Sequence, residues 1–363
     1  FNITPASEIM AILCMCKGMD DLKQRLGNIY IGTTFGGDAV FARDLNAVGA
    51  MAILLKDAIK PNLVQTLEGN PAILHGGPFA SIAQGTNSIL ATQMGLSLSE
   101  YVITEAGFAA DLGAEKFFDI KCVNAGLKPK AVVVVATVRA LRHHGGAKKD
   151  ELTIPSIEKV EKGLANLGKH LENMQLFGMK AVVAINHFPG DTAEEIAAIK
   201  SYCKNYNTEA VVCKGFTEGG KGMTELAQAV ATLVERGESN FKPLYDREVS
   251  IEEKIHTIAT RIYGANAVEF SVKAKTQLKH IKELGFEHMP VCMAKTPKSL
   301  SDDEKRIGRP VDFIVKVREF EFAAGAGFVI PILGEMMRMP GLPVIPAAEG
   351  IDIDANGVIT GLS

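Results

Sequence analysis

The sequence contains no tryptophan, and aromatic residues make up only 6% of its 363 residues. The cysteines form no C-x-x-C pair, and none has a histidine partner at metal-binding spacing. There are six of them: Cys14, Cys16, Cys122, Cys203, Cys213 and Cys292. A disulfide framework or a structural zinc site therefore has little support, and we expect a reducing, cytoplasmic compartment and no bound structural metal.

Neither sign of charge dominates, because 39 lysines and arginines face 42 aspartates and glutamates. A net charge of −3 is too small for binding driven by phosphate neutralisation, so we expect no nucleic-acid partner. The longest apolar run, residues 131–138, is strand-sized and far short of the ~18 residues that cross a bilayer. We therefore expect no membrane partner either.

Four apolar runs predict strands, and three of them are nearly unbroken in Val, Ala and Ile. The runs are residues 101–104, 131–138, 181–185 and 210–213. Because they lack period-two alternation, we expect strands covered on both faces, as in a parallel sheet. Helical patterns at residues 155–177 and 191–206 separate them, which indicates an α/β fold built from βαβ units.

Further helices are expected at residues 4–16, 42–59, 79–94, 250–263 and 273–284, and further strands at residues 289–293, 313–320 and 328–332. The length gives a prior of roughly two to three domains. We expect three: residues 1–165, 166–258 and 259–363.

Ligands of open parallel sheets bind beyond the carboxyl ends of the strands, so the residues after each run are the first candidates for a site. These segments are residues 105–108, 139–146, 186–189 and 214–216. Three of them carry a phenylalanine: Phe108, Phe188 and Phe216. Singly, each phenylalanine is more simply explained as a cap on the sheet core, but together they favour a slot for a flat ring system.

Two glycine-rich stretches could hold an anion. The segment His75-Gly76-Gly77-Pro78 precedes an expected helix, although a tight turn explains it equally well. Residues 215–222 nearly match the phosphate-binding pattern G-x-x-x-x-G-K-[ST], but Gly222 stands where a hydroxyl would hold Mg²⁺. We therefore expect no genuine phosphate-binding loop there.

Four other features have plain structural explanations. Residues 324–327 favour packing over dinucleotide binding, and residues 299–304 favour a helix N-cap. His143-His144 favours a solvent-exposed loop pair over a zinc site. The methionines at 336, 337 and 339 favour a core role over a cofactor contact.

Long stretches spread over the chain resemble formate–tetrahydrofolate ligase. They are LLKDAIKPNLVQTLE at 54–68, HGGPFA at 75–80, TEAGF at 104–108, ADLGAEKFFDIKC at 110–122, PVCMAKT at 290–296 and MPGLP at 339–343. The resemblance implies a mostly parallel sheet of the P-loop NTPase-like type, incomplete here, followed by smaller α/β domains. It also implies a cytoplasmic homotetramer that joins formate to tetrahydrofolate with ATP and Mg²⁺, through formyl phosphate, and possibly a monovalent cation as activator.

The resemblance assigns site residues by position. It implies that Phe108 and Phe216 sandwich the pterin, with Phe216 where the family usually has tryptophan. The other substrate-binding residues that it implies are Glu105, Gly107, Gly76, Gly77 and Pro78. It places Asn186, Phe188 and Pro189 near the nucleotide, with His187 replacing an arginine of the family.

The family's phosphate-binding loop and its formyl-phosphate arginine match nothing in this sequence, so the catalytic residues are unknown. Since Phe1 is not a start residue, we expect an N-terminal segment to be missing and the isolated chain to be inactive. A non-catalytic folate-binding or assembly protein derived from the ligase is the alternative. A dinucleotide-dependent dehydrogenase is poorly supported, since no strand–G-x-G-x-x-G–helix unit occurs.

Overall fold

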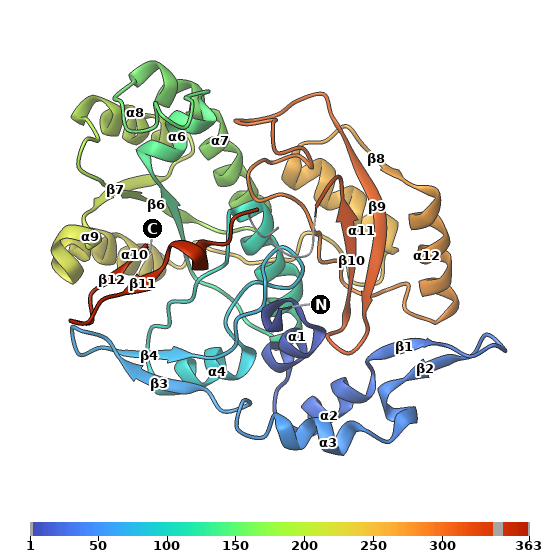
Figure 1. Ribbon diagram of the computed structural model, residues 1–363. Coiled ribbons are helices and arrows are strands. Elements are labelled where there is room, and N and C mark those ends of the chain that lie inside the picture. Colours follow the sequence, from blue (N-terminus) through green and yellow to red (C-terminus); the bar gives the residue numbers. More distant parts are fainter. Residues whose placement is uncertain (1–2, 337–343, 362–363) are drawn as a thin grey trace.

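A computed structural model describes residues 3–336 and 344–361 (Figure 1). The fold is mixed α/β, with one small parallel sheet and several other small sheets. The parallel sheet contains β5 (Val132–Ala136), β6 (Ala181–Asn186) and β7 (Glu209–Cys213) in that order. A mixed sheet has the order β10-β9-β8, from β8 (Ala267–Phe270), β9 (Ile314–Ala323) and β10 (Phe328–Leu333).

Three antiparallel hairpins complete the described strands. They pair β1 (Tyr30–Thr33) with β2 (Ala39–Phe41), β3 (Asn62–Gln65) with β4 (Pro71–Leu74), and β11 (Asp352–Ile353) with β12 (Ile359–Thr360). In Figure 1 the β1–β2 and β3–β4 hairpins extend from opposite sides of the lower part of the molecule.

The α-helices are α1 (Glu8–Met15), α2 (Met19–Gly27), α3 (Val48–Leu54), α4 (Ile89–Leu98), α5 (Val123–Ala125), α6 (Val138–His144), α7 (Ile157–Leu176), α8 (Ala193–Lys204), α9 (Gly215–Glu218), α10 (Thr224–Arg236), α11 (Ile251–Thr257) and α12 (Val272–Glu283). Short 3₁₀ segments are η1 (Thr4–Ala6), η2 (Ala42–Leu45), η5 (Gly219–Met223) and η7 (Ala347–Gly350), and π-helical segments are η3 (Ala110–Ala114), η4 (Phe117–Cys122) and η6 (Ile258–Tyr263).

Helices cover both faces of the parallel sheet. One face packs against α6, α7 and α8 through residues such as Val183, Leu164 and Ile199, and the other packs against α10 through Val182 and Leu226. This two-sided cover explains the unbroken apolar sequence of β6. β5 is an edge strand, and the side chain of Val135 remains 64% exposed.

The largest core lies between the parallel and mixed sheets. Its buried residues come from η4, α7, α11, η6, α12, β9 and β10, with Phe118, Phe177 and Tyr263 among the largest. Burying such aromatic side chains supplies much of the stability of a domain, at roughly 25 cal/mol per Å² of apolar surface.

Several sequence predictions are confirmed. Strands β5, β6, β7, β9 and β10 and helices α7, α8 and α12 lie where the patterns indicate, and residues 250–263 form α11 continued by η6. The hydroxyls of Ser156 and Thr192 cap α7 and α8, which explains where these helices begin. Met336 packs partly buried against a core cluster, whereas Met337, Met339 and the stretch 339–343 lie outside the described residues.

Other predictions are wrong. Residues 101–104 form no strand, since they pair with no neighbour and Ile103 is 91% exposed. Residues 289–293 make only an isolated bridge through Val291. The expected helix at 79–94 begins only at Ile89, capped by Ser88, while Ser7 and Asn46 interrupt those at 4–16 and 42–59.

Two of the local explanations are also wrong. No helix follows residues 299–304 in the described structure; instead Ser299 and Ser301 are buried and bond each other in a turn. His143 and His144 close α6, and His144 Nδ1 accepts from the Gly308 N–H, so the pair is not a solvent-exposed loop.

The expected domain limits fall inside continuous elements. Helix α7 continues through 165/166, and α11 with η6 continues through 258/259, so cuts at these places would divide helices. Among the described residues, no helix is both long and apolar enough to cross a membrane.

Candidate functional site

Phe188 and Phe216 lie side by side beyond the ends of two adjacent strands. β6 and β7 are parallel and in register, so the segments that leave their carboxyl ends emerge at the same edge of the sheet. The two ring centroids are 6.1 Å apart, with an interplanar angle of 39°. The rings are 37% and 78% exposed, so neither phenylalanine serves as a buried cap on the sheet core.

Backbone contacts fix the segment that carries Phe188. The N–H of His187 donates to the carbonyl of Cys213 at 2.9 Å, which extends the pairing beyond Asn186. The N–H of Phe188 donates to Asp191 Oδ2 at 2.9 Å. The turn of residues 186–189 is therefore held rigidly against β7.

The tip of the β3–β4 hairpin holds the loop that carries Phe216. Glu68 Oε1 accepts from the N–H of Gly220 at 2.7 Å. Gly219 has φ +58°, in the left-handed region that favours glycine, and a Cβ atom added at Gly220 would come within 2.3 Å of Glu68 Oε2 and displace that side chain. Because the N–H of Gly220 already donates to a carboxylate, residues 215–222 do not form an empty phosphate-binding loop.

The glycine-rich segment 75–78 is fixed mainly by packing. His75 is buried, with Nδ1 2.6 Å from Ser88 Oγ and Nε2 2.7 Å from the carbonyl of Ala58. Gly76 has φ +74°, and a Cβ there would lie 2.2 Å from Cys14 Sγ. The prediction that a helix N-terminus follows this segment directly is wrong, because α4 begins at Ile89.

Two buried lysines join the segment 75–88 to the segment 105–122. Lys116 Nζ donates to the carbonyl of Ala80 at 2.5 Å, and Lys121 Nζ donates to that of Asn87 at 2.6 Å. The Gly107 N–H donates to the carbonyl of Gly85 at 3.0 Å. These contacts join the segments 75–88 and 105–122 into one unit through residues 80–87, although the two segments lie apart in the chain.

Phe108 follows Gly107 in a strained backbone conformation. Its φ is +62°, in the left-handed region that costs a non-glycine residue about 1 kcal/mol, and its side chain is 54% exposed. Among the ring contacts of the described residues, Phe188 pairs with Phe216 and none includes Phe108. Its segment does not leave a strand of the parallel sheet, which removes the geometric reason for expecting it beside the other two rings.

The family model for formate–tetrahydrofolate ligase matches residues 1–363 of this sequence. The chain belongs to this family. Its members are ATP-dependent ligases of one-carbon metabolism that form formyltetrahydrofolate from formate and tetrahydrofolate.

The segment 110–122 also holds a buried charged cluster that the sequence patterns did not indicate. Asp111 Oδ2 lies 2.7 Å from Lys295 Nζ, and His170 lies beside the other carboxylate oxygen. Burial raises the pKa of Asp111, but Lys295 and His170 outweigh it, so the pKa lies below its ordinary value. No sequence motif marks this cluster, because Asp111, His170 and Lys295 come from three segments far apart in the chain.

Two further carboxyl groups of the ligase lie within this segment. Burial raises the pKa of Glu115 well above its ordinary range, and the nearby Asp119 raises it further. Burial also raises the pKa of Asp119 to about 8, despite a hydrogen bond from the Leu244 N–H. Both groups are therefore largely protonated at neutral pH, which avoids burying two adjacent negative charges.

Arg142, in the expected rim segment 139–146, has a structural role in the ligase. Its guanidinium forms a buried, two-pronged ion pair with Glu195, with an Nη2–Oε2 distance of 2.6 Å. Glu195 also accepts from the backbone N–H groups of Ser156 and Thr192. The pair ties α6 to the start of α8 beside the segment 186–189.

The Mg²⁺ and monovalent cation that the resemblance implies have no cluster of His, Cys, Asp or Glu ligands among the described residues. Within residues 3–336 and 344–361, no group of three or more His, Cys, Asp or Glu side chains is arranged to hold a metal ion. Gly222 also brings no hydroxyl to the loop after β7. We therefore assign no chemical step in this chain to a metal.

Proposed function

We propose that this chain supplies the folate side of an ATP-dependent reaction that joins formate to tetrahydrofolate and gives 10-formyltetrahydrofolate through formyl phosphate. The observation that carries the proposal is the exposed pair Phe188 and Phe216 at the carboxyl edge of a parallel sheet, in a chain of this family. Such an edge is where open α/β sheets bind ligands. Stacking a pterin on an aromatic face contributes roughly 0.5–1.5 kcal/mol beyond area burial.

The spacing of the two rings defines how the pterin binds. A flat ring between two aromatic faces needs a separation of about 7 Å, twice a van der Waals contact distance. The centroids are 6.1 Å apart and the ring planes are tilted by 39°, so a sandwich requires the two rings to move apart and become parallel. Phe216 is the ring that moves, because it is the more exposed and lies on the one-turn helix α9.

The unit formed by residues 75–88 and 105–122 is proposed to hold the reacting formyl group beside N10 of the folate. Gly76, Gly77 and Pro78 would let the formyl group come close to the backbone. Glu105, Gly107 and Phe108 would border the opposite side of that group. Asn186 and Pro189 are proposed to border the nucleotide. The role of these residues is to bind, orient and exclude water.

The ATP phosphates are proposed to be held by residues outside the 363 of this sequence. No segment of the sequence has the full G-x-x-x-x-G-K-[ST] pattern. In the nearest match, residues 215–222, the N–H of Gly220 already donates to the Glu68 carboxylate. With such a phosphate-binding part, the sheet of β5, β6 and β7 would complete the P-loop NTPase-like core that the resemblance implies. A homotetramer, a division into three domains whose limits avoid α7 and η6, and a cytoplasmic location belong to the same proposal, and the buried, unpaired cysteines suit a reducing compartment.

Two assays test this function. Tetrahydrofolate should bind the purified chain in calorimetry, and the chain alone should release no ADP when given ATP, Mg²⁺ and formate. Absence of tetrahydrofolate binding would contradict the folate site, and formate-dependent ADP release would contradict the external phosphate cradle. Binding that never gives turnover with a complete ligase partner segment would instead support a non-catalytic folate-binding protein.

A further inference from the structure

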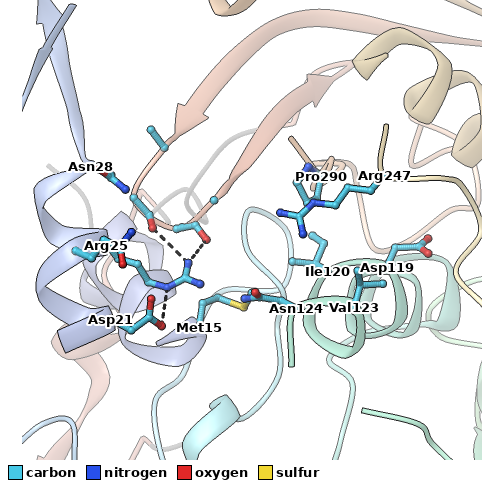
Figure 2. A pocket seen from close by; sticks show the side chains of 15 residues that line it. Met15, Asp21, Arg25, Asn28, Asp119, Ile120, Val123, Asn124, Arg247 and Pro290 are labelled. Carbon is cyan, nitrogen blue, oxygen red and sulfur yellow. Dashed lines mark hydrogen bonds and ion pairs between the residues drawn. The ribbon is translucent and has the colours of Figure 1, made fainter. Parts of the chain in front are cut away.

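A cavity lined by both polar and apolar residues lies away from the proposed folate site. It has a volume of about 210 Å³, and its lining includes neither the phenylalanine pair nor the glycine-rich segment (Figure 2). It is formed by α2, the end of η4 with α5, the segment before α11, and the turn between β9 and β10.

The sequence of α2 explains one wall. Asp21, Gln24, Arg25 and Asn28 recur at helical spacing and so lie on one face, which lines the cavity. Arg25 Nε pairs with Asp21 Oδ2 at 3.1 Å, and its Nη1 donates to the carbonyl of Ala326 at 3.0 Å. These contacts hold the guanidinium at the cavity and leave Nη2 without a described partner.

Arg247 supplies the opposite side. Its side chain is exposed and makes no hydrogen bond or ion pair within the described part of the chain, although Asp246 and Glu248 are its neighbours in sequence. In Figure 2 the guanidinium groups of Arg25 and Arg247 both point into the cavity, from opposite walls. The amide of Asn124 lines the space between them.

The acidic residues of the cavity do not cancel this positive charge. Asp21 is already paired with Arg25. Burial raises the pKa of Asp119 to about 8, which disfavours the charged form of that carboxyl. The charge of Arg247 therefore remains uncompensated within the cavity.

We propose that this cavity binds a phosphate group, either free or carried by a molecule of a few carbon atoms, between Arg25 and Arg247. Guanidinium groups bind phosphate through paired, charge-assisted hydrogen bonds, and two of them on opposite walls match the diverging oxygens of a tetrahedral anion. The cavity is large enough for a phosphate group and a few carbon atoms. This site is independent of the proposed folate site.

Calorimetric titration of the full chain tests the proposal, with inorganic phosphate in one arm and glycerol 3-phosphate in the other, both at constant ionic strength set by sodium chloride. We expect saturable binding in at least one arm, weakened at least tenfold by Arg247→Gln. Arg247 is exposed, so this variant should fold. Arg236→Gln, which removes an exposed arginine at the end of α10, is the matched control and should bind as the original chain does.

A second variant tests the same cavity without removing a charge. Asn124→Ala removes a neutral lining amide and should weaken the same arm to a smaller extent. Absence of saturable binding in both arms, or equal affinities of the Arg247→Gln and Arg236→Gln variants, would overturn the proposal. Because the readout is anion binding, failure here leaves the folate assignment standing, and the reverse also holds.

Discussion

Glu68 accepts a 2.7 Å hydrogen bond from the backbone of Gly220, which joins the tip of an exposed hairpin to the loop that carries Phe216. β3 is exposed along its whole length, so this contact is a principal anchor of the hairpin tip. A charge-assisted hydrogen bond of this kind contributes roughly 1.5–3 kcal/mol.

Glu68→Ala should therefore weaken tetrahydrofolate binding about tenfold, because the loop that presents Phe216 becomes mobile. Glu68→Gln, whose amide oxygen still accepts, should retain most of the affinity. Calorimetry on these variants and on Glu161→Ala, an exposed position of α7, checks the effect. Unchanged affinity in a folded Glu68→Ala chain would show that the hairpin does not position Phe216.

Phe108→Gly should stabilise the chain and impair its function together. Glycine relieves the left-handed strain at φ +62°, so the free energy of unfolding in urea should rise by about 1 kcal/mol. Formyl transfer in the complete enzyme should fall, because the exposed ring is lost. Asn207→Gly, at φ +52°, is the matched control, since asparagine tolerates this region. If Phe108→Gly left activity intact, the strain would have no functional meaning.

His144 should make the fold sensitive to mild acid. Burial lowers its pKa from 6.5 to about 4, and its Nδ1 must stay unprotonated to accept from Gly308. The unfolded state therefore binds the proton more readily than the folded state, and stability is lost as the pH falls from about 6.5 to about 4. The contribution is at most about 3 kcal/mol.

Urea unfolding at about pH 7 and about pH 4.5 measures this effect. His144→Asn should show a smaller loss of stability between the two than the original chain, whereas His256→Asn, at an exposed position of α11, should match the original. Equal losses in all three chains would exclude His144 as the sensitive group.

Sequence patterns correctly predicted the strands of the parallel sheet and the helices that begin at a capping residue. The unbroken Val and Ala runs identified β5 and β6, and serine or threonine caps marked α7 and α8. The same pattern failed at residues 101–104, because an apolar run of four residues has no strand character without a neighbouring strand. Whether such a short run becomes a strand depends on a neighbouring strand that the sequence alone does not reveal.

For the candidate site, the sequence predicted Phe188 and Phe216 at one sheet edge because both follow neighbouring parallel strands. It could not predict the Glu68–Gly220 contact or the charged cluster around Asp111, since these depend on how distant segments pack. Phe108 was expected beside the other two rings because residues 101–104 were predicted to form a strand of the same sheet. Since these residues form no strand, that expectation loses its geometric basis.

Tetrahydrofolate affinity of Phe188→Ala, Phe216→Ala and the double variant, measured by calorimetry, tests the account most directly. Phe35→Ala, a fully exposed phenylalanine in the β1–β2 hairpin on the other side of the molecule (Figure 1), is the control. Each single variant at the site should weaken binding by about 1–3 kcal/mol, and the double variant should show coupling of at least about 0.5 kcal/mol. Affinities equal to that of the Phe35→Ala control in both single variants would contradict the proposed pterin site.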